Sequence, residues 1–459
     1  MKIAVLNGSP KGELSVTMQY VKFIQKKYPK HSMTFYNISR DIKKIERDRS
    51  AFDAVIKGVE KADLVIWAVP LYVCLVPSQY KRFIEMIREL NADHVFRDKY
   101  TAVITTSIHF YDHTAHNYMR AVTEDLGMKF AGAFSPDMFD LMKDGEREKL
   151  LIFAESVFTT VTKKSAVTRS FHPLKPVKLK YTRNETAKKI NQGDKKILVV
   201  TDAGKNQKNL AAMIEKFRNS FVHEVELINL HDIDIRGGCL GCCQCGFDYR
   251  CVYTGADGYI DFYNNYMKTA DILVFAGFIQ DRYLSSKWKQ VFDRAFFNTH
   301  TPTLRGKQIG YLISGPLGQI PNLREILTAY TEWQKANVVD FITDEYNSSA
   351  ELDAIIEGFA EKTIAYAEKE FITPESFLGV GGMKVFRDDI WGRLRFVFQA
   401  DHKFYEKHGY YDFPQKDKKA KDMNKSMITA TKNPETREQI RKMIKTEMVK
   451  GHQYIVETK

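Results

Sequence analysis

Hydrophobic and polar positions along the chain follow a succession of patterns that occurs twice. Short apolar runs at Lys2–Leu6 and Lys196–Val200 each lead through a turn into an amphipathic stretch, Thr17–Lys27 and Leu210–Phe217. Apolar runs of about five residues that alternate with amphipathic helices are typical of parallel βαβ units. The pattern therefore predicts an α/β fold with doubly wound parallel sheets, which bind ligands in the loops beyond the carboxyl ends of their strands.

Two further pairs of predicted strands establish this duplication and its spacing. Lys61–Ile66 matches Thr269–Val274, and Lys99–Ile104 matches Lys307–Leu312, both at a shift of 208 residues. The first strands are shifted by only 194 residues, so the second copy has 14 more residues between its first strand and the next matched one. Five of the six cysteines crowd into this stretch, within Cys239–Cys251. One copy therefore contains a cysteine segment that the other lacks.

The duplication predicts the division of the chain into parts. We expect two tandem α/β domains at 1–162 and 196–370, a basic linker at 163–195, and a helical, basic C-terminal extension at 371–459. Within the extension, the aromatic residues of 388–408 indicate a helix that packs on the core, with a partner or homodimer contact as the alternative. A further helix is expected at Pro434–Lys450.

The net charge of +12 suggests a nucleic-acid function, but the excess lies outside the predicted domains. Lys163–Lys196 carries a net charge of +9 and Gln415–Lys459 one of +6, so the remaining residues sum to −3. A groove that follows phosphates needs its cations within a folded domain. We interpret the basic stretches as a solvated linker and tail, and expect no nucleic-acid partner. The 44% of hydrophobic residues also excludes wholesale disorder.

Neither targeting nor membrane segments are expected. The longest uncharged apolar stretch, Leu64–Pro77, has 14 residues and contains two prolines, which is too short for a membrane span. The apolar run at the N-terminus is too short for a signal peptide. A secreted disulfide framework would spread its cysteines along the chain, so their crowding favours a reducing, cytoplasmic environment.

The cysteine segment has the spacing C-x2-C-x2-C-x5-C. The four cysteines are Cys239, Cys242, Cys245 and Cys251, and Cys243 is an additional thiol. Two short spacings suit a cubane iron–sulfur cluster, because each loop presents its sulfur to a different iron. The glycines that permit such turns are Gly237, Gly238 and Gly241. Zinc is the main alternative, although zinc ribbons place two C-x2-C pairs well apart.

The loop after the first predicted strand has the chemistry of an anion site. Ser9, Ser15 and Thr17 supply hydroxyl groups at a helix N-terminus, and Lys11 adds a positive charge. Taken alone, this Gly-Ser-Pro turn has an alternative interpretation as an ordinary turn with a helix cap.

Two further loops strengthen the anion-site interpretation. One loop follows the second matched strand and supplies Pro70, Leu71, Tyr72 and Val73; the other follows the third and supplies Thr106, Ser107 and His109. All three loops converge on one edge of the predicted sheet, as a mononucleotide with a planar ring requires. The alternatives are a core role for Tyr72 and an ordinary polar loop role for His109.

The second copy lacks these ligands. Its residues at the positions of Gly8, Ser9, Ser15 and Thr17 are Asp202, Ala203, Asn209 and Ala211, and those at the positions of Pro70 and Tyr72 are Phe278 and Gln280. Three hydroxyl donors are lost and a carboxylate faces the phosphate position. We therefore expect one mononucleotide per chain, in the first copy.

The motifs of the first copy resemble the NAD(P)H-dependent FMN reductase group of flavodoxin-like proteins. The motifs are Gly8–Lys11, Ser15–Val16–Thr17, Pro70–Tyr72 and Lys81. The cysteine spacing is similar to that of the iron–sulfur flavoproteins of this group. The resemblance implies FMN, a [4Fe–4S] cluster and two tandem flavodoxin-like domains. The use of NAD(P)H is implied by the resemblance alone.

These observations lead to one functional hypothesis and two alternatives. We expect a fused pseudo-dimer that transfers electrons between FMN in the first domain and a [4Fe–4S] cluster in the second, with a small molecule or protein as donor or acceptor. The chain departs from the family in its tandem domains and in Asp257-Gly258, where the family has paired acids. The alternatives are an NAD(P)H-dependent flavin, quinone or azo reductase with structural zinc, and a non-enzymatic redox or metal sensor.

Overall fold

The structure, a computed structural model, describes residues 1–185 and 189–458. The strands and helices of the first half (residues 1–162) are β1 (Lys2–Asn7), α1 (Val16–Lys27), β2 (Ser32–Tyr36), α2 (Ile38–Arg47), α3 (Arg49–Glu60), β3 (Leu64–Pro70), α4 (Ser78–Glu89), β4 (Tyr100–Thr106), α5 (Asp112–Asp125), β5 (Lys129–Phe134) and α6 (Asp144–Thr162).

The second half (residues 196–370) repeats this succession with one large difference. Its strands and helices are β6 (Ile197–Thr201), α7 (Lys208–Asn219), β7 (Glu226–Asn229), α8 (Tyr259–Phe262), β8 (Ile272–Phe278), α9 (Ser286–Arg294), β9 (Gln308–Ser314), α10 (Pro321–Trp333), β10 (Asn337–Thr343) and α11 (Ser349–Glu368). The remaining helices are α12 (Phe377–Trp391), α13 (Gln399–Lys407), α14 (Lys418–Ala430) and α15 (Pro434–Thr458).

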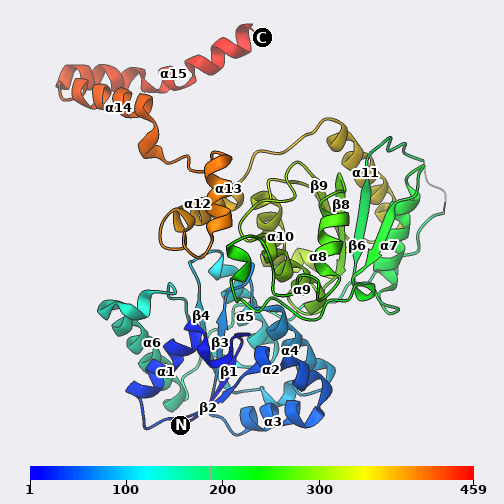
Figure 1. Cartoon of the computed structure of the whole chain (residues 1–459), viewed down its shortest axis with the longest axis vertical. Helices are drawn as coiled ribbons and strands as arrows, with labels where there is room; N and C mark the ends of the chain where they lie inside the picture. Colours follow the sequence, from blue (N-terminus) through cyan, green and yellow to red (C-terminus); the bar gives the residue numbers. More distant parts are fainter. Residues whose placement is uncertain (186–188, 459) are drawn as a thin grey trace. The chain divides into compact units, whose positions relative to one another are not determined.

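The two halves each contain a parallel sheet of five strands with the same order (Figure 1). The first sheet runs β2-β1-β3-β4-β5, and the second, taken from its outer edge, runs β7-β6-β8-β9-β10. Every strand pair is parallel, and this order is the flavodoxin-like one. The predicted α/β class with two parallel sheets and a helical C-terminal region is thereby confirmed.

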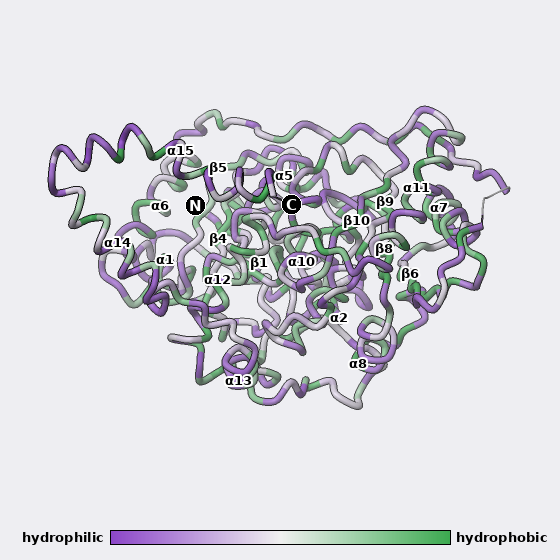
Figure 2. The backbone as a smooth tube through the Cα atoms, turned by 90° about the horizontal axis from the view of Figure 1, so that it is seen from above, coloured by the Kyte–Doolittle hydropathy of each residue, from purple (hydrophilic) through white to green (hydrophobic). Residues whose placement is uncertain are grey.

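The central strands are apolar because helices cover both of their faces. β3 and β8 each bury six of seven residues, the near-continuous apolar run that a parallel sheet requires. One face of the first sheet forms a core with α1 and α6, and one face of the second forms a core with α7 and α11. Figure 2 shows hydrophobic stretches of the backbone gathered around β4, β8 and β9.

The shift of 208 residues read from the sequence holds for the strands of the structure. β8, β9 and β10 correspond to β3, β4 and β5 at this shift. The contacts at the strand starts are also repeated: Lys2 N donates to Asp63 Oδ2 over 2.7 Å, and Lys196 N donates to Asp271 Oδ2 over 2.9 Å. Equivalent side chains thus fix the same junction in both sheets.

The halves differ most between the second and third strands of each sheet. In the first half this connection folds into α2 and α3, whereas in the second half it contains the cysteine segment (Cys239–Cys251) and the short α8. The sequence suggested 14 added residues. The structure shows instead that the cysteine segment takes the place of two helices in a connection that is longer overall.

The two halves meet where α4 packs against α9. Ser78 N donates to Asp293 Oδ2 over 2.7 Å, and Ser286 N donates to Glu85 Oε1 over 2.6 Å. Because these residue pairs correspond at the shift of 208, each half makes the same contact on the other. This reciprocity is the signature of a two-fold dimer interface, here between two parts of one chain.

The segment 163–195 has almost no regular secondary structure among its described residues. It is held against both halves: Ser170 N donates to Glu124 Oε2 over 2.9 Å in the first half, and the Tyr181 hydroxyl donates to Asp353 Oδ1 over 2.5 Å in the second. Tyr181 is part of the second core. The segment is therefore bonded to both halves at these positions.

The C-terminal region differs from its predicted helices. The single helix expected at 388–408 is wrong: α12 ends at Trp391, because the backbone of Gly392 leaves the helical conformation, and α13 starts only at Gln399. α14 was not expected, and α15 continues to Thr458 beyond its predicted end.

The chain forms two compact units, Met1–His402 and Lys403–Lys459. Both sheets and the segment that joins them belong to the first unit, and α14 and α15 belong to the second. Across the described part of the chain, no helix combines the length and apolarity that a membrane span requires.

Candidate functional site

A cavity of about 370 Å³ lies at the carboxyl ends of β1, β3 and β4, and we call it the flavin-loop cavity. Ten of the twelve residues predicted to hold FMN line it: Lys11, Ser15, Val16, Thr17, Pro70, Leu71, Tyr72, Val73, Thr106 and Ser107. The three loops converge because parallel strands end at one edge of the sheet. The sequence motifs therefore meet in space as the topology requires.

The start of α1 forms the anion-binding corner of this cavity. Ser15 is the N-cap, and its hydroxyl accepts from Met18 N over 3.2 Å. The hydroxyl groups of Thr17 and Thr106, which are 2.6 Å apart, join this helix to the end of β4. The first N–H groups of a helix have no partner within it, so this corner favours a phosphate.

Two predicted ligands, Ser9 and His109, do not reach the cavity wall. Ser9 is fully buried, and its hydroxyl accepts from Lys11 N over 3.2 Å, so it fixes the turn beneath the cavity. His109 is exposed, and its Nδ1 lies 2.9 Å from Asp112 Oδ2. The sequence placed both residues in the correct loops but could not give the direction of their side chains.

The opposite wall of the flavin-loop cavity comes from the second half and from the segment that follows it. Its aromatic members are Phe292, Phe296, Tyr330, Trp333, Phe386 and Phe398. The sequence did not indicate Phe292, Phe296, Tyr330, Trp333 or Phe386 as site residues. Only the packing of the second half and of α12 on the first half brings them to this cavity. The aromatic content of 388–408 was a signal for Phe398, but it did not show that this residue lines the cavity.

A histidine held by a buried carboxylate also lines this cavity. His300 Nδ1 lies 2.8 Å from Asp401 Oδ2, and Asp401 also accepts from the Thr301 hydroxyl over 2.9 Å. Asp401 is fully buried, so the imidazole is oriented by a fixed partner. This arrangement can hold or move a proton beside the cavity.

All five thiols of the cysteine segment line a second, small cavity, which we call the cysteine cavity. Two of them, Cys239 and Cys243, also line the flavin-loop cavity. The two cavities therefore share a wall. Cys245 is buried, whereas Cys242 is exposed.

The donors of the cysteine cavity are thiols, the type that both an iron–sulfur cluster and a structural zinc ion use. Within residues 1–185 and 189–458, no three His, Cys, Asp or Glu side chains lie close enough together to bind a single metal ion. A [4Fe–4S] cluster uses four thiolates, each on a different iron, so its ligands surround a volume. Five thiols from one short segment line this cavity, which has a volume of about 20 Å³.

A buried ion pair between Arg294 and Asp257 lies beside the cysteine cavity. Arg294, which lines the cavity, donates from Nη1 to Asp257 Oδ2 over 2.7 Å and to Gly237 O over 3.0 Å. Burial raises the pKa of Asp257, but the hydrogen bonds and charge of Arg294 outweigh it and hold that pKa below its ordinary value. A fixed guanidinium beside a cluster stabilises its negative charge.

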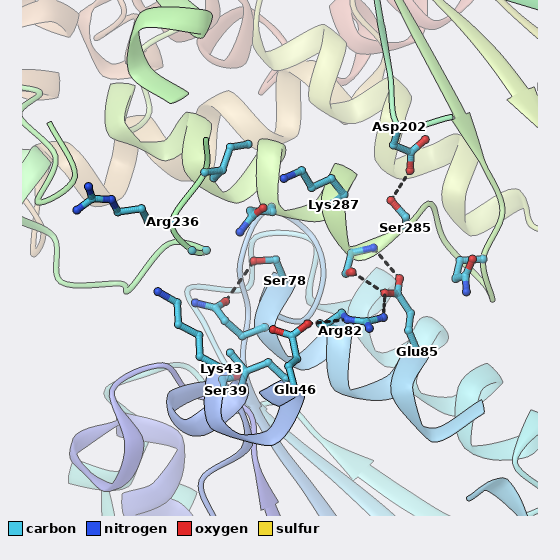
Figure 3. A pocket seen from close by; sticks show the side chains of 18 of the residues that line it. Ser39, Lys43, Glu46, Ser78, Arg82, Glu85, Asp202, Arg236, Ser285 and Lys287 are labelled. Carbon is cyan, nitrogen blue, oxygen red and sulfur yellow. Dashed lines mark hydrogen bonds and ion pairs between the residues drawn. The ribbon is translucent and has the colours of Figure 1, made fainter. Parts of the chain in front are cut away.

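A third cavity of about 690 Å³ lies near the starts of α4 and α9, and we call it the mixed-charge cavity because both basic and acidic side chains line it (Figure 3). It contains Asp202, Phe278 and Gln280, the second-half counterparts of Gly8, Pro70 and Tyr72. Burial raises the pKa of Asp202 to about 7, and Ser285 donates a hydrogen bond to its carboxylate. The loops of the second half therefore open on a cavity with different chemistry.

Comparison with known proteins supports the fold of the first half. The family model for NADPH-dependent FMN reductases matches residues 1–135. The first half therefore has the fold of FMN-dependent NAD(P)H reductases. No curated protein matches the chain.

Several solved structures are similar to part of the chain. An FMN-dependent NADH-azoreductase from Bacillus anthracis in complex with FMN is 13% identical, with 36% of this chain and 99% of that chain covered and a TM-score of 0.27. FerB, a flavoenzyme NAD(P)H:(acceptor) oxidoreductase from Paracoccus denitrificans, is 16% identical, with coverages of 34% and 97% and a TM-score of 0.27. Smu.1420 from Streptococcus mutans is 16% identical, with coverages of 35% and 100% and a TM-score of 0.26.

Proposed function

We propose that this protein is a flavin-dependent oxidoreductase that transfers electrons between FMN in its first half and a [4Fe–4S] cluster in its second. The observation that carries the proposal is the shared wall of two cavities. Cys239 and Cys243 line both the cavity of the predicted FMN ligands and the cavity of the cysteines. Two cofactors bound there are neighbours, as electron transfer requires.

The first half supplies the groups that hold FMN. The hydroxyls of Ser15 and Thr17 and the first turn of α1 bind the phosphate, and Lys11 adds charge at the rim. The loop from Pro70 to Val73 and the residues Thr106 and Ser107 flank the ring. The match of residues 1–135 to FMN reductases supports this assignment.

The second half supplies the cluster ligands Cys239, Cys242, Cys245 and Cys251. Cys245 is buried and Cys239 is half-buried, and Arg294 places a buried positive charge in the same cavity. When bound, FMN exchanges one or two electrons and the cluster one, so together they connect two-electron and one-electron partners. The aromatic wall from the second half excludes water from the FMN ring.

The reciprocal α4–α9 contact supports the interpretation of the chain as a fused pseudo-dimer. In that arrangement each half contributes one cofactor to a single productive pair. NAD(P)H, another small molecule or an electron-transfer protein serves as donor. His300, oriented by Asp401, holds a proton beside the FMN cavity for donors or acceptors that exchange protons with electrons.

The test is a cofactor analysis of protein purified without oxygen. We expect flavin absorbance with about one FMN per chain, and about four iron and four acid-labile sulfide. One zinc per chain with FMN and no sulfide would establish the zinc-containing reductase in place of the cluster protein. Both cofactors without turnover of reduced donors and artificial acceptors would instead indicate a sensor.

A further inference from the structure

The side chain of Tyr72 occupies the boundary between the flavin-loop cavity and the cysteine segment. Tyr72 lines the flavin-loop cavity. Its hydroxyl lies against the backbone of Gly241, because a Cβ at Gly241 would be only 1.8 Å from Tyr72 Oη. Gly241 stands between two of the proposed cluster ligands, and its N donates to Cys239 Sγ over 3.4 Å. The hydroxyl therefore reaches the loop that carries the sulfur atoms.

This hydroxyl lacks an acceptor within the protein. Tyr72 Oη is buried and has no hydrogen-bond partner among the residues that the structure describes. A buried hydroxyl without a partner is unfavourable, so native proteins rarely retain one. Sulfur atoms can accept a hydrogen bond, and two cysteines of the segment, Cys239 and Cys243, line the flavin-loop cavity together with Tyr72.

The backbone holds Tyr72 in this position despite local strain. Tyr72 N donates to Leu75 O over 2.8 Å, and Leu75 N donates back to Tyr72 O over 3.0 Å, which closes a tight turn. The turn residues Val73 and Cys74 have φ values of 41° and 62°, in the left-handed region that disfavours a β-branched side chain. Lys289 of the second half adds a bond from Nζ to Tyr72 O over 2.8 Å.

We propose that the Tyr72 hydroxyl donates a hydrogen bond to a sulfur of the cluster and thereby sets the cluster's reduction potential. Tyr72 is then a positioning residue whose ring borders the FMN and whose hydroxyl touches the cluster. Hydrogen bonds to cluster sulfurs stabilise the more negative, reduced state and raise the potential. The inference rests on the proposed function, since it requires the cluster.

The test is a redox titration of Tyr72→Phe, which removes the hydroxyl and keeps the ring. At a fixed poise near the midpoint, we expect the ratio of oxidised to reduced cluster to rise about tenfold, which is a shift of about 59 mV to more negative potential for one electron. The iron and sulfide contents should stay unchanged, and the FMN content is measured in the same sample because Tyr72 belongs to the proposed FMN loops. If the variant loses FMN, the reduction potential of its cluster is compared with that of the cluster in wild-type protein from which FMN has been removed.

Tyr253→Phe is the matched control. Tyr253 lines the cysteine cavity, and its hydroxyl donates to Gly238 O over 3.5 Å. An unchanged cluster potential in Tyr72→Phe, or an equal shift in Tyr253→Phe, overturns the inference. Wild-type protein without iron and sulfide would refute the proposed function itself, and this result is seen before any variant is titrated.

Discussion

The two halves of this chain share one framework and differ in nearly everything attached to its binding edge. Both sheets have the same strand order, and three strands of each correspond at a shift of 208 residues. At the binding edge, the first half carries hydroxyl groups around an apolar cavity. The second half instead carries a buried carboxylate, Asp202, in the wall of the mixed-charge cavity. The framework resists change because its central strands are buried, while loops are free to diverge.

Two copies of one fold can form a single candidate site when their loops differ. A symmetric dimer would contain two equivalent sites. Here the cysteine segment of the second half adjoins the FMN loops of the first, whereas the helix pair α2 and α3 stands at the equivalent place in the first half. Only one of the two possible sites therefore has both kinds of ligand.

The largest expected effect concerns the cysteine segment, which has no counterpart in the first half. In Cys245→Ser, we expect iron and acid-labile sulfide to fall from about four per chain to below about one, because a buried thiolate ligand is lost. FMN content should remain as in the wild type. Iron, sulfide and flavin are quantified in the same anaerobic sample.

Cys243→Ser is the control within the same segment. Cys243 is the fifth thiol, so this variant should keep its iron and sulfide. If Cys243→Ser loses the cluster while Cys242→Ser retains it, our choice between these adjacent cysteines is wrong.

The next largest effect concerns the proposed phosphate site of the first half, which has no counterpart in the second half. Ser15→Ala combined with Thr17→Ala should weaken FMN binding at least about a hundredfold, since each hydrogen bond to a charged group contributes about 1.5–3 kcal/mol. The dissociation constant is measured by flavin fluorescence on protein from which FMN has been removed. Iron content should not change.

The matched variant in the second half is Asn209→Ala, at the position that corresponds to Ser15. Asn209 bonds within the second half, where its Nδ2 donates to Asp344 Oδ2 over 2.8 Å. We expect a lower melting temperature and unchanged FMN affinity. An equal loss of FMN in this variant would show that the second half takes part in the phosphate site.

A third effect concerns the lysines of the α4–α9 interface. Lys81 lies 2.8 Å from Glu85 and 3.1 Å from Asp281, whereas among the described residues Lys289 has one acidic partner, Asp293, and also donates to Tyr72 O. Burial raises the pKa of Asp293 and Lys289 offsets only part of it, so this acid can take up a proton when its partner is lost. Urea unfolding should therefore show a loss of about 3–5 kcal/mol for Lys81→Met and a smaller loss for Lys289→Met. Equal losses would contradict the inferred asymmetry.

The smallest effect concerns Asp202, whose first-half counterpart is Gly8. Its pKa is raised by burial from 3.8 to about 7, so between these values the folded state keeps a proton that the unfolded state has lost. Stability from neutral Asp202 is therefore lost as the pH rises through this range. Asp202→Asn should remove the dependence, and its stability advantage should grow by roughly 2–3 kcal/mol from pH 5 to pH 7. Parallel stability curves for both proteins would refute the assignment.

Much of the fold and half of the site could be read from the sequence. The apolar runs predicted the strands, and the offsets located the connection in which the halves differ. The three loops of the predicted FMN site meet at one cavity, because parallel topology sends all strand ends to one edge. Helix ends were less predictable: Gly392 divides the aromatic stretch into α12 and α13, and no periodicity indicated this break.

Sequence alone determined the local chemistry: which residues can hold a phosphate, which thiols form a set, and which copy lost its hydroxyl groups. Only the tertiary structure decided which of these groups are neighbours. The contact of Tyr72 with Gly241, the aromatic wall from α9 and α10, and the shared wall of the two cavities all depend on the packing of one half against the other. That packing depends on surfaces formed by residues far apart in the sequence. A local pattern of apolar and polar residues does not show which surface packs against which.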